Sequence, residues 1–336
     1  MRIRSYSLNR RLLTLVIIIV ALVASNYFLS RNYTVVAPGA TVNLREIVSV
    51  ESGSKEGEGS FFLTTVSSRP LNIPLFIHAA YSPHVNIIKR EKMIPPGWTI
   101  KDYLNYMKSW MEESQKIAEV VALRKAGYEP KILGEGAQIV GIMDESPAKG
   151  KLFQGDIIKK VDNKDITIAD EVVKNISARA VGDVVQLQVE RQGELVNVSV
   201  PTIESNNQEG QTIIGIYITT LNWKPVLPLE IRINTGNIGG PSAGSMFAME
   251  ILNQLSSKDL TKGKKVAGTG TIGLNERIGE VGGVKQKIIA ANRDGAQIFF
   301  VPENNAAEAK EASKGLSINV VPVKHLDDML HYLESL

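Results

Sequence analysis

Ser242 is the residue whose surroundings best fit nucleophilic chemistry. It lies in the segment Gly239-Gly240-Pro241-Ser242-Ala243-Gly244, where small neighbours leave its hydroxyl approachable and the proline favours the first turn of a helix. The apolar pattern that follows predicts such a helix, so free backbone N–H groups would point at the serine. We therefore expect the backbone around Gly240, Pro241 and Ala243 to stabilise an oxyanion. A serine that only helps to cap a helix is the plainer alternative.

A serine hydroxyl is a weak nucleophile until a base accepts its proton. A lysine can act as that base when burial lowers its pKa. Lys285 follows Gly282-Gly283 and lies in the first turn of a predicted helix, where the helix dipole disfavours a cation. We predict that Lys285 is the base and that Lys287 faces elsewhere. Histidine, the more usual partner, occurs only before residue 85 and in the terminal helix, as His78, His84, His325 and His331.

Two other patterns compete with this interpretation. Residues 268–273 match the dinucleotide pattern GxGxxG, but the residues that follow predict a turn rather than the helix that this pattern requires. Residues 240–244 also fit the nucleophile elbow GxSxG, which would recruit Asp294 and His325. Few residues follow Ser242, however, and no HGGG-like segment precedes it. Because the sequence has no cysteine and no HExxH pattern, we predict no metal site and no cofactor.

The positive charge of the chain is concentrated at its N-terminus. The formal net charge is +3, and Arg2, Arg4, Arg10 and Arg11 alone contribute +4, which leaves −1 for the rest. This balance gives no indication of a nucleic-acid partner.

An uncharged segment at residues 12–29 is just long enough to span a bilayer as a helix. The arginines before it would stay in the cytoplasm, so residues 1–30 are predicted to form a basic stub and a single-pass anchor. The rest of the chain, with its catalytic region, would then lie outside the cytoplasm. A cleaved signal peptide is the alternative, because Ala24 and Ser25 are small enough for a cleavage site.

The remaining sequence predicts a multidomain α+β protein. Short strand-like runs occupy residues 33–95, and a helix over about 100–126 begins with a capping box at Thr99–Asp102. Its stripe of Tyr103, Met107 and Trp110 is predicted to be core packing. Together these elements form a predicted segment, 31–130, of unassigned role.

Residues 131–203 predict a compact β-rich unit. It contains the run Ser146-Pro147-Ala148, the segment GDIIKKVDN at 155–163, and two alternating strands around the turn 191–193, which predict a hairpin. This order resembles the PDZ domains attached to bacterial proteases. The resemblance implies an extended peptide partner bound at a sheet edge. It also places the grip on the peptide's carboxylate in a loop of Leu133, Gly134, Glu135 and Gly136. A spacer domain without a ligand is the alternative.

A polar segment at 205–210 is the best predicted linker, and three ordered motifs follow it. They are GPSAG at 240–244, TGTI at 269–272 and GGVKQKIIAANRDGA at 282–296. In this order and spacing they resemble the proteolytic domain of Lon-type serine peptidases, over residues 210–336. The resemblance implies that Ser242 is the nucleophile, that Lys285 is the general base and that Thr269 supports the lysine by a hydrogen bond. It also implies a homo-oligomer, because such domains often form rings.

Two departures from the Lon pattern narrow the function that the resemblance implies. Gly239 stands where ATP-dependent Lon enzymes carry an acidic residue, and the sequence has no Walker A pattern for an ATPase motor. With the anchor and the PDZ-like unit, the chain resembles the secreted Lon-like peptidases of Gram-positive bacteria. The implied function is an ATP-independent, membrane-anchored serine endopeptidase that cleaves flexible secreted peptides or small membrane-protein ectodomains. The alternative is an inactive, membrane-tethered PDZ scaffold.

Overall fold

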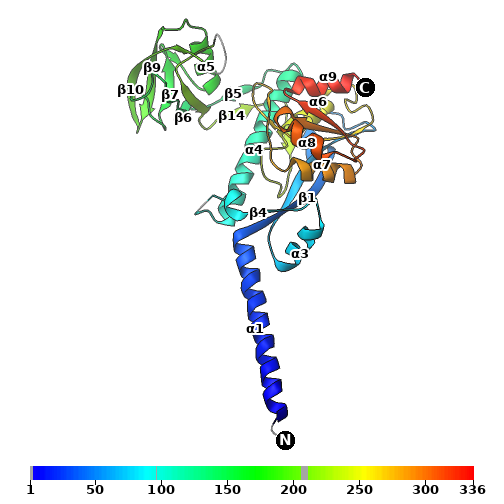
Figure 1. The fold of residues 1–336 in the computed structure, drawn as a ribbon. Helices are drawn as coiled ribbons and strands as arrows, with labels where there is room; N and C mark the ends of the chain where they lie inside the picture. Colours follow the sequence, from blue (N-terminus) through cyan, green and yellow to red (C-terminus); the bar gives the residue numbers. More distant parts are fainter. Residues whose placement is uncertain (1–2, 96, 206–210) are drawn as a thin grey trace. The chain divides into compact units, whose positions relative to one another are not determined.

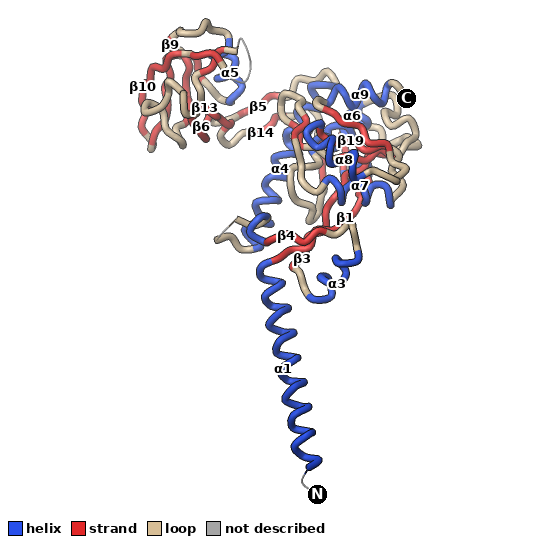
Figure 2. Tube along the Cα trace, in the orientation of Figure 1, coloured by secondary structure: helices blue, strands red, loops and turns tan. Residues whose placement is uncertain are grey.

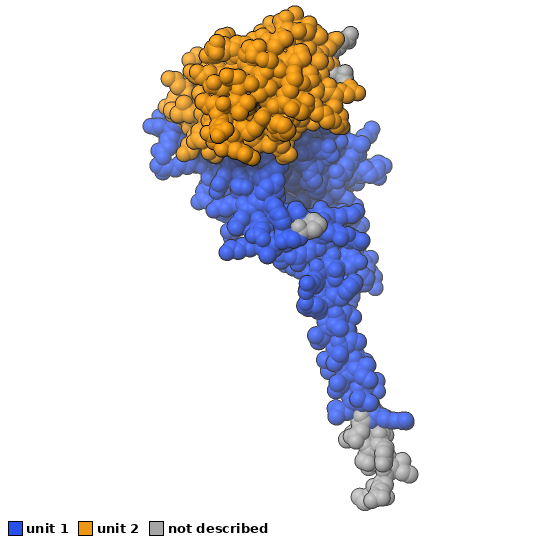
Figure 3. Space-filling model, turned by 90° about the vertical axis from the view of Figure 1, so that its left-hand side faces the viewer, with its two compact units in different colours: residues 1–128, 229–336 blue, residues 129–228 orange. Residues whose placement is uncertain are grey.

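The computed structural model describes residues 3–95, 97–205 and 211–336, and the side chains of residue 10 and of residues from 12 on. The chain forms two compact units (Figure 3): unit 1 is Met1–Tyr128 with Leu229–Leu336, and unit 2 is Glu129–Pro228. The predicted multidomain α+β class with an N-terminal apolar helix is confirmed. Most of the predicted linker, residues 206–210, lies outside the described residues.

A six-stranded sheet organises unit 1 (Figures 1 and 2), with the strand order β20-β19-β16-β3-β1-β4. The neighbours from β20 to β3 are parallel, whereas β3 and β4 both pair antiparallel with β1. The strands are β1 (Tyr33–Asn43), β3 (Ser60–Pro70), β4 (Asn86–Lys89), β16 (Lys265–Gly268), β19 (Ile298–Pro302) and β20 (Asn319–Val323); the short pairs are β2 (Val48–Val50) with β15 (Ile231–Ile233), and β17 (Thr271–Ile272) with β18 (Ile278–Gly279).

The central position of β3 corrects the predicted boundary between a separate segment 31–130 and a proteolytic domain that starts at residue 210. Phe61 of β3 lies opposite Val266 of β16, and Leu63 lies opposite Gly268. Phe61 and Leu63 are buried in the same core as Val266. The two stretches of sequence therefore share one sheet and one core. Burial of each such side chain contributes roughly 1.5–3 kcal/mol to the stability of this shared core.

Helices cover both faces of this sheet. Phe300 of β19 packs with α6 and α9, whereas the next residue on each side, Phe299 and Val301, packs with α7 and α8, as the alternation of side chains along a strand requires. The helices of unit 1 are α1 (Ile3–Asn32), α2 (Leu44–Ile47), α3 (Ile73–Tyr81), η1 (Arg90–Lys92), α4 (Ile100–Lys125), α6 (Gly244–Leu255), α7 (Val284–Arg293), η2 (Glu303–Asn305), α8 (Ala306–Ala312) and α9 (Leu326–Glu334).

Helix α4 begins as its sequence predicts. Thr99 and Asp102 form a reciprocal capping box, with N–H to side-chain distances of 2.9 and 3.2 Å. Met111, Ala118 and Val121 then belong to the core cluster that also contains α6 residues. Because α4 packs on α6 in this way, it runs directly over the helix that follows Ser242.

Helix α1 contains a 21-residue apolar segment, Leu12–Asn32, in which no residue is buried. Its length and composition fit either a membrane span or a signal sequence.

Unit 2 is a small β-rich domain with the sheet order β10-β9-β7-β6-β13 and, among its described residues, one helix, α5. The predicted hairpin is confirmed: β9 and β10 pair antiparallel, and Gln192 and Gly193 both have positive φ, as a tight hairpin turn requires. The elements are β5 (Lys131–Leu133), β6 (Ala137–Ile142), β7 (Ile157–Val161), β8 (Lys164–Asp165), α5 (Ala169–Ser177), β9 (Val184–Arg191), β10 (Glu194–Pro201), β11 (Ile203–Glu204), β12 (Thr212–Ile213), β13 (Ile216–Thr220) and β14 (Lys224–Val226).

Candidate active site

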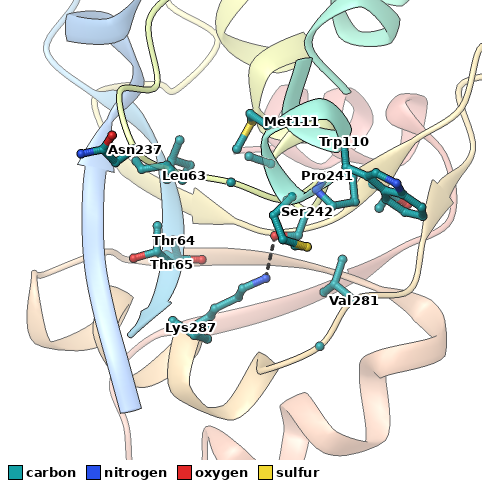
Figure 4. A pocket seen from close by; sticks show the side chains of 18 of the residues that line it. Leu63, Thr64, Thr65, Trp110, Met111, Asn237, Pro241, Ser242, Val281 and Lys287 are labelled. Atoms are coloured by element: carbon teal, nitrogen blue, oxygen red, sulfur yellow. Dashed lines mark hydrogen bonds between the residues drawn. The ribbon is translucent and has the colours of Figure 1, made fainter. Parts of the chain in front are cut away.

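Ser242 lies in the wall of a cavity of about 560 Å³ in unit 1 (Figure 4). The serine comes two residues before α6, which begins at Gly244 rather than at the predicted Pro241. Ser242 is half-buried, whereas the helix behind it is almost wholly buried. The serine is therefore held by a rigid core element while its hydroxyl reaches an open space.

The lysine that meets this serine is Lys287. Its Nζ lies 2.9 Å from the Oγ of Ser242 and 2.8 Å from the Oγ1 of Thr269. Figure 4 shows the Lys287 side chain reaching from α7 toward Ser242. The three residues come from three places in the chain. Ser242 lies in the turn before α6, Thr269 directly follows β16, and Lys287 lies in α7. Since α6 and α7 lie on opposite faces of the sheet, the two side chains meet beyond the end of β16.

Burial changes the acid–base character of this lysine. Lys287 is only 3% exposed, and burial lowers its pKa from 10.5 to about 8, while the charge of Glu308 opposes the shift. A shift of this size corresponds to ~3 kcal/mol against the charged form. A substantial fraction of Lys287 is therefore neutral at mildly alkaline pH, as a general base must be.

The structure brings Lys287 to Ser242 in place of the predicted Lys285. Lys285 is half-buried, and its backbone N–H donates to a carboxylate oxygen of Glu308 at 3.4 Å. The reason is the phase of α7. Val284, Ile288 and Ala291 are buried against the sheet, and position 287 falls on that same stripe at helical spacing, whereas position 285 does not. The apolar pattern of the helix therefore contained the signal that identifies Lys287.

Thr269 does hydrogen-bond a lysine, as the resemblance implied, but that lysine is Lys287. Its hydroxyl also donates to the backbone oxygen of Ser242 at 3.0 Å. The sequence predicts one strand over 265–272, whereas the structure ends β16 at Gly268 and begins β17 at Thr271. This break leaves the threonine hydroxyl beside both catalytic candidates. Thr269 is thus placed to orient both the lysine and the serine.

The structure leaves only part of the predicted oxyanion backbone with free N–H groups. The N–H of Gly240 donates to the backbone oxygen of Met107 at 2.7 Å, so it is already engaged, and Pro241 has no N–H. Within the described ranges, the N–H groups of Ser242 and Ala243 have no hydrogen-bond partner. These two groups are therefore the candidates for oxyanion stabilisation.

Helix α4 supplies a wall of the cavity that the sequence interpretation missed. Tyr103, Met107, Trp110 and Met111 line it, and Trp110 is 46% exposed, so the predicted core-packing role of the stripe is wrong for its N-terminal part. Ser114 also donates to the backbone oxygen of Pro241 at 3.0 Å. The sequence carries no signal for this exposure, because an aromatic stripe at helical spacing reads the same whether it packs in a core or lines a cavity.

Neither residue of the hydrolase alternative reaches this cavity. Asp294 follows the last turn of α7 and forms an ion pair with Arg293 at 2.9 Å. His325 precedes α9 and pairs with Arg277 through the backbone. Across 3–95, 97–205 and 211–336, no group of three or more His, Asp or Glu side chains could hold a metal ion.

In unit 2, the structure corrects the predicted carboxylate grip at Leu133–Gly136. The N–H of Glu135 donates to Leu221 and that of Gly136 donates to Thr167, at 2.9 and 3.0 Å. Leu133 is paired in a short sheet with Lys224 of β14. The N–H groups of Glu135 and Gly136 are thus already engaged within unit 2. An apolar groove of about 80 Å³ instead lies elsewhere in unit 2, lined by Val172, Val173 and Ile176 of α5 and by residues 211–216 and Ile218.

Comparison with known proteins identifies both regions. The family described as the Lon protease (S16) C-terminal proteolytic domain matches residues 228–334, and the PDZ domain family matches residues 115–202. The Lon protease of Trichlorobacter lovleyi is 31% identical over 113 residues, which are 32% of this chain and 14% of that protein. The Lon protease of Azospirillum brasilense is 30% identical over 142 residues, which are 42% and 17% respectively.

Among solved structures, the PDZ domain of an SdrC-like protein from Listeria monocytogenes is 22% identical. The match covers 26% of this chain and 92% of the Listeria chain, with a TM-score of 0.24.

The family matches indicate a proteolytic domain of the serine-peptidase type at residues 228–334 and a second, separate domain at residues 115–202. More particularly, the chain contains a Lon protease (S16) proteolytic domain and a PDZ domain. The matched residues span only 14% and 17% of the length of these two curated Lon proteases. Membership of the S16 domain family supports a serine peptidase.

Proposed function

We propose that this protein is a membrane-anchored serine endopeptidase in which Ser242 is the nucleophile and Lys287 the general base. The observation that carries the proposal is the 2.9 Å contact between Lys287 Nζ and Ser242 Oγ, made by a lysine that is 3% exposed. Burial of a lysine lowers the stability of the fold, and such strongly perturbed groups cluster at functional sites. A neutral amine beside a serine hydroxyl can act there as a general base.

The reaction would begin when neutral Lys287 accepts the proton of Ser242 while Oγ attacks the scissile carbonyl carbon. The negative charge that develops on the carbonyl oxygen would be met by the N–H groups of Ser242 and Ala243. Protonated Lys287 then donates to the leaving amine, and the amide bond breaks to give an acyl-enzyme. Lys287 next deprotonates a water, whose attack releases the acid and regenerates the serine. Throughout, Thr269 would hold the Nζ in line with Ser242.

An extended peptide is the substrate form that the cavity favours. Strand β3 pairs with β16 only through Ser60–Leu63, and its next residues, Thr64, Thr65 and Val66, line the cavity with Ser242. Along the described chain, no strand pairs with that stretch of β3 on the β16 side. A flexible substrate segment can add itself to such an edge by main-chain hydrogen bonds. We therefore propose flexible secreted peptides and small membrane-protein ectodomains as substrates.

The anchor and its orientation are part of the proposal. The apolar segment Leu12–Asn32 has the length of a bilayer span, and the arginines before it favour a cytoplasmic N-terminus. The proteolytic and PDZ domains would then act outside the cytoplasm. We also propose that turnover needs no ATP.

Within the PDZ domain, we propose that a peptide partner binds in the apolar groove beside α5. Strand β13 is the last strand of its sheet. It pairs with β6 along one edge, and no strand of the described chain pairs with its other edge. A peptide can therefore extend the sheet between β13 and α5, with an apolar side chain in the groove.

The full-length chain in liposomes, assayed with and without ATP on an unfolded protein such as casein, tests the peptidase proposal. The wild type should cleave at the same rate under both conditions, and Ser242→Ala should be slower by on the order of 10⁴-fold. Cleavage that persists in Ser242→Ala would contradict the proposal. If neither protein cleaves and a serine-reactive phosphonate does not label Ser242, the tethered scaffold is the better account.

A further inference from the structure

Helix α3 consists almost entirely of apolar residues, yet none of its residues is buried. Its sequence is IPLFIHAAY, in which His78 is the one basic residue. Phe76 is 49% exposed, Ile77 54% and Tyr81 86%. Moving one such side chain from water to an apolar environment contributes roughly 1.5–3 kcal/mol. A helix that exposes several together is therefore built to meet an apolar partner.

The position of α3 beside α1 indicates what that partner is. The N–H of Ile73 donates to the side-chain oxygen of Asn26 at 3.1 Å. Phe76 lines a cavity with Ala24, Ser25, Phe28 and Leu29 of α1, and Figure 1 shows α3 next to the C-terminal end of α1. At ~1.5 Å per residue, this part of α1 lies about 5–12 Å before the end of the apolar segment at Asn32. That depth is the boundary between acyl chains and headgroups, where amphipathic and apolar helices lie in the plane of a bilayer.

Basic residues surround the point where α1 ends. Arg31 is in its last turn, Lys89 pairs with Tyr33 at the start of β1, and Arg69 pairs with Val35. Arg90 and Lys92 follow in η1, and Glu91 is the acidic residue of that turn. Clustered cations of this kind are attracted to anionic lipid headgroups. They would repel each other if two copies of the chain met at α3, so a lipid surface fits the site better than a second copy.

We propose that α3 is a membrane-docking helix that lies in the outer interface of the bilayer, with the surrounding basic residues on anionic phospholipid headgroups. This inference rests on the proposed role of α1 as the membrane anchor. It adds a second attachment, so that unit 1 is held to the membrane by a span and an in-plane helix rather than by a flexible tether.

The consequence for the active site follows from the shared lining of two cavities. Tyr103 of α4 lines the cavity at Ser242 and also lines a smaller one with Ser30 and Thr34, where α1 gives way to β1. Docking of α3 would therefore hold the cleft near the bilayer surface. Peptide segments close to the membrane would reach it more readily than segments far from it.

The absence of cysteine from the sequence makes a direct test simple. Single-cysteine variants of the full-length chain carry an environment-sensitive NBD fluorophore in liposomes of phosphatidylcholine with about 30% phosphatidylglycerol. Val20→Cys reports on the span, and Ile77→Cys reports on α3. Lys310→Cys on α8 is a water-exposed control, and Leu195→Cys, 62% exposed in unit 2, is a control for an exposed apolar position. Nitroxide-labelled lipids should quench the probes at positions 20 and 77 by at least twofold and leave both controls unchanged.

The outcomes separate this inference from the proposed anchor. Quenching at position 20 without quenching at position 77 would overturn the docking helix and leave the anchor standing. Quenching at neither position would overturn both. If the probe at position 77 is shielded from nitroxide lipid and from aqueous iodide alike, and Ile77→Cys forms disulfide-linked dimers, a second copy covers α3 and the inference is wrong.

Discussion

The cleft at Ser242 and the groove beside α5 contrast in how they are built. The cleft buries polar groups: Lys287 is enclosed and bonded to both Ser242 and Thr269, which come from different elements. The groove is lined mostly by apolar side chains such as Val173 and Ile214, beside a strand at the end of its sheet. The cleft therefore has the features of a site for a reaction, and the groove those of a site for recognition. Chemistry requires charged groups held out of water, whereas peptide recognition requires only an open edge and an apolar pocket.

The largest effect that distinguishes the two sites is expected in the pH profile of cleavage. Since the pKa of Lys287 is about 8, about half of it is neutral at pH 8 and roughly 1% at pH 6. The cleavage rate should fall about fiftyfold over that interval, while peptide binding to the groove, whose described lining residues include no such group, should change little. Initial rates at constant ionic strength measure this, with circular dichroism to verify folding. A flat rate profile from pH 6 to 8 would refute the assignment of Lys287.

Burial of Lys287 should also make the cleft costly to fold. The pKa is lower in the folded chain than its ordinary value of 10.5, so the unfolded chain binds more protons between pH 8 and 10.5, and stability rises with pH across that window. Lys287→Met removes this penalty. It should raise the free energy of unfolding of unit 1 by about 1–2 kcal/mol at pH 7, after the loss of two hydrogen bonds is discounted.

That gain should disappear as the pH approaches 10.5. Urea unfolding at pH 7 and pH 10, followed by tryptophan fluorescence, measures it, with Lys285→Met as the matched control that should change little at either pH. A Lys287→Met protein that is less stable than wild type at pH 7 would show that the lysine stabilises the fold instead.

The smallest expected effect concerns the groove. Val173 is 47% exposed and lines it, so Val173→Glu can alter the groove without disturbing the core. Binding of a fluorescein-labelled hexapeptide with a C-terminal valine should weaken about tenfold in fluorescence anisotropy. Glu135→Ala, in the loop first predicted as the carboxylate grip, should bind within twofold of wild type. A larger loss of affinity for Glu135→Ala than for Val173→Glu would indicate that the peptide binds at that loop.

Prediction from sequence succeeded where the signal was local. The helix after the serine segment, the capping box at Thr99, the hairpin turn at 191–193 and the order of mixed elements all depend on residues close in sequence. These features follow from turn chemistry, proline at a helix start and alternation along strands.

Prediction failed where the deciding contact is distant in sequence or depends on the rotation of a helix. The N–H of Glu135 donates to the backbone oxygen of Leu221, and the N–H of Gly240 donates to that of Met107 in α4. No local sequence pattern predicts either hydrogen bond. The choice of Lys285 over Lys287 followed the argument from the helix dipole. The buried stripe of Val284, Ile288 and Ala291 instead fixes the rotation of α7 and turns Lys287 inward, to Ser242.

The measurement that bears most directly on this account is a comparison of Lys287→Met with Lys285→Met, each in the full-length chain, by the rate of casein cleavage at pH 8. The lysines are two positions apart on one helix, and methionine preserves most of the side-chain volume in each case. We predict a loss of about 10³-fold or more for Lys287→Met and a rate within about threefold of wild type for Lys285→Met. A large loss for Lys285→Met with near-normal cleavage by Lys287→Met would contradict the account.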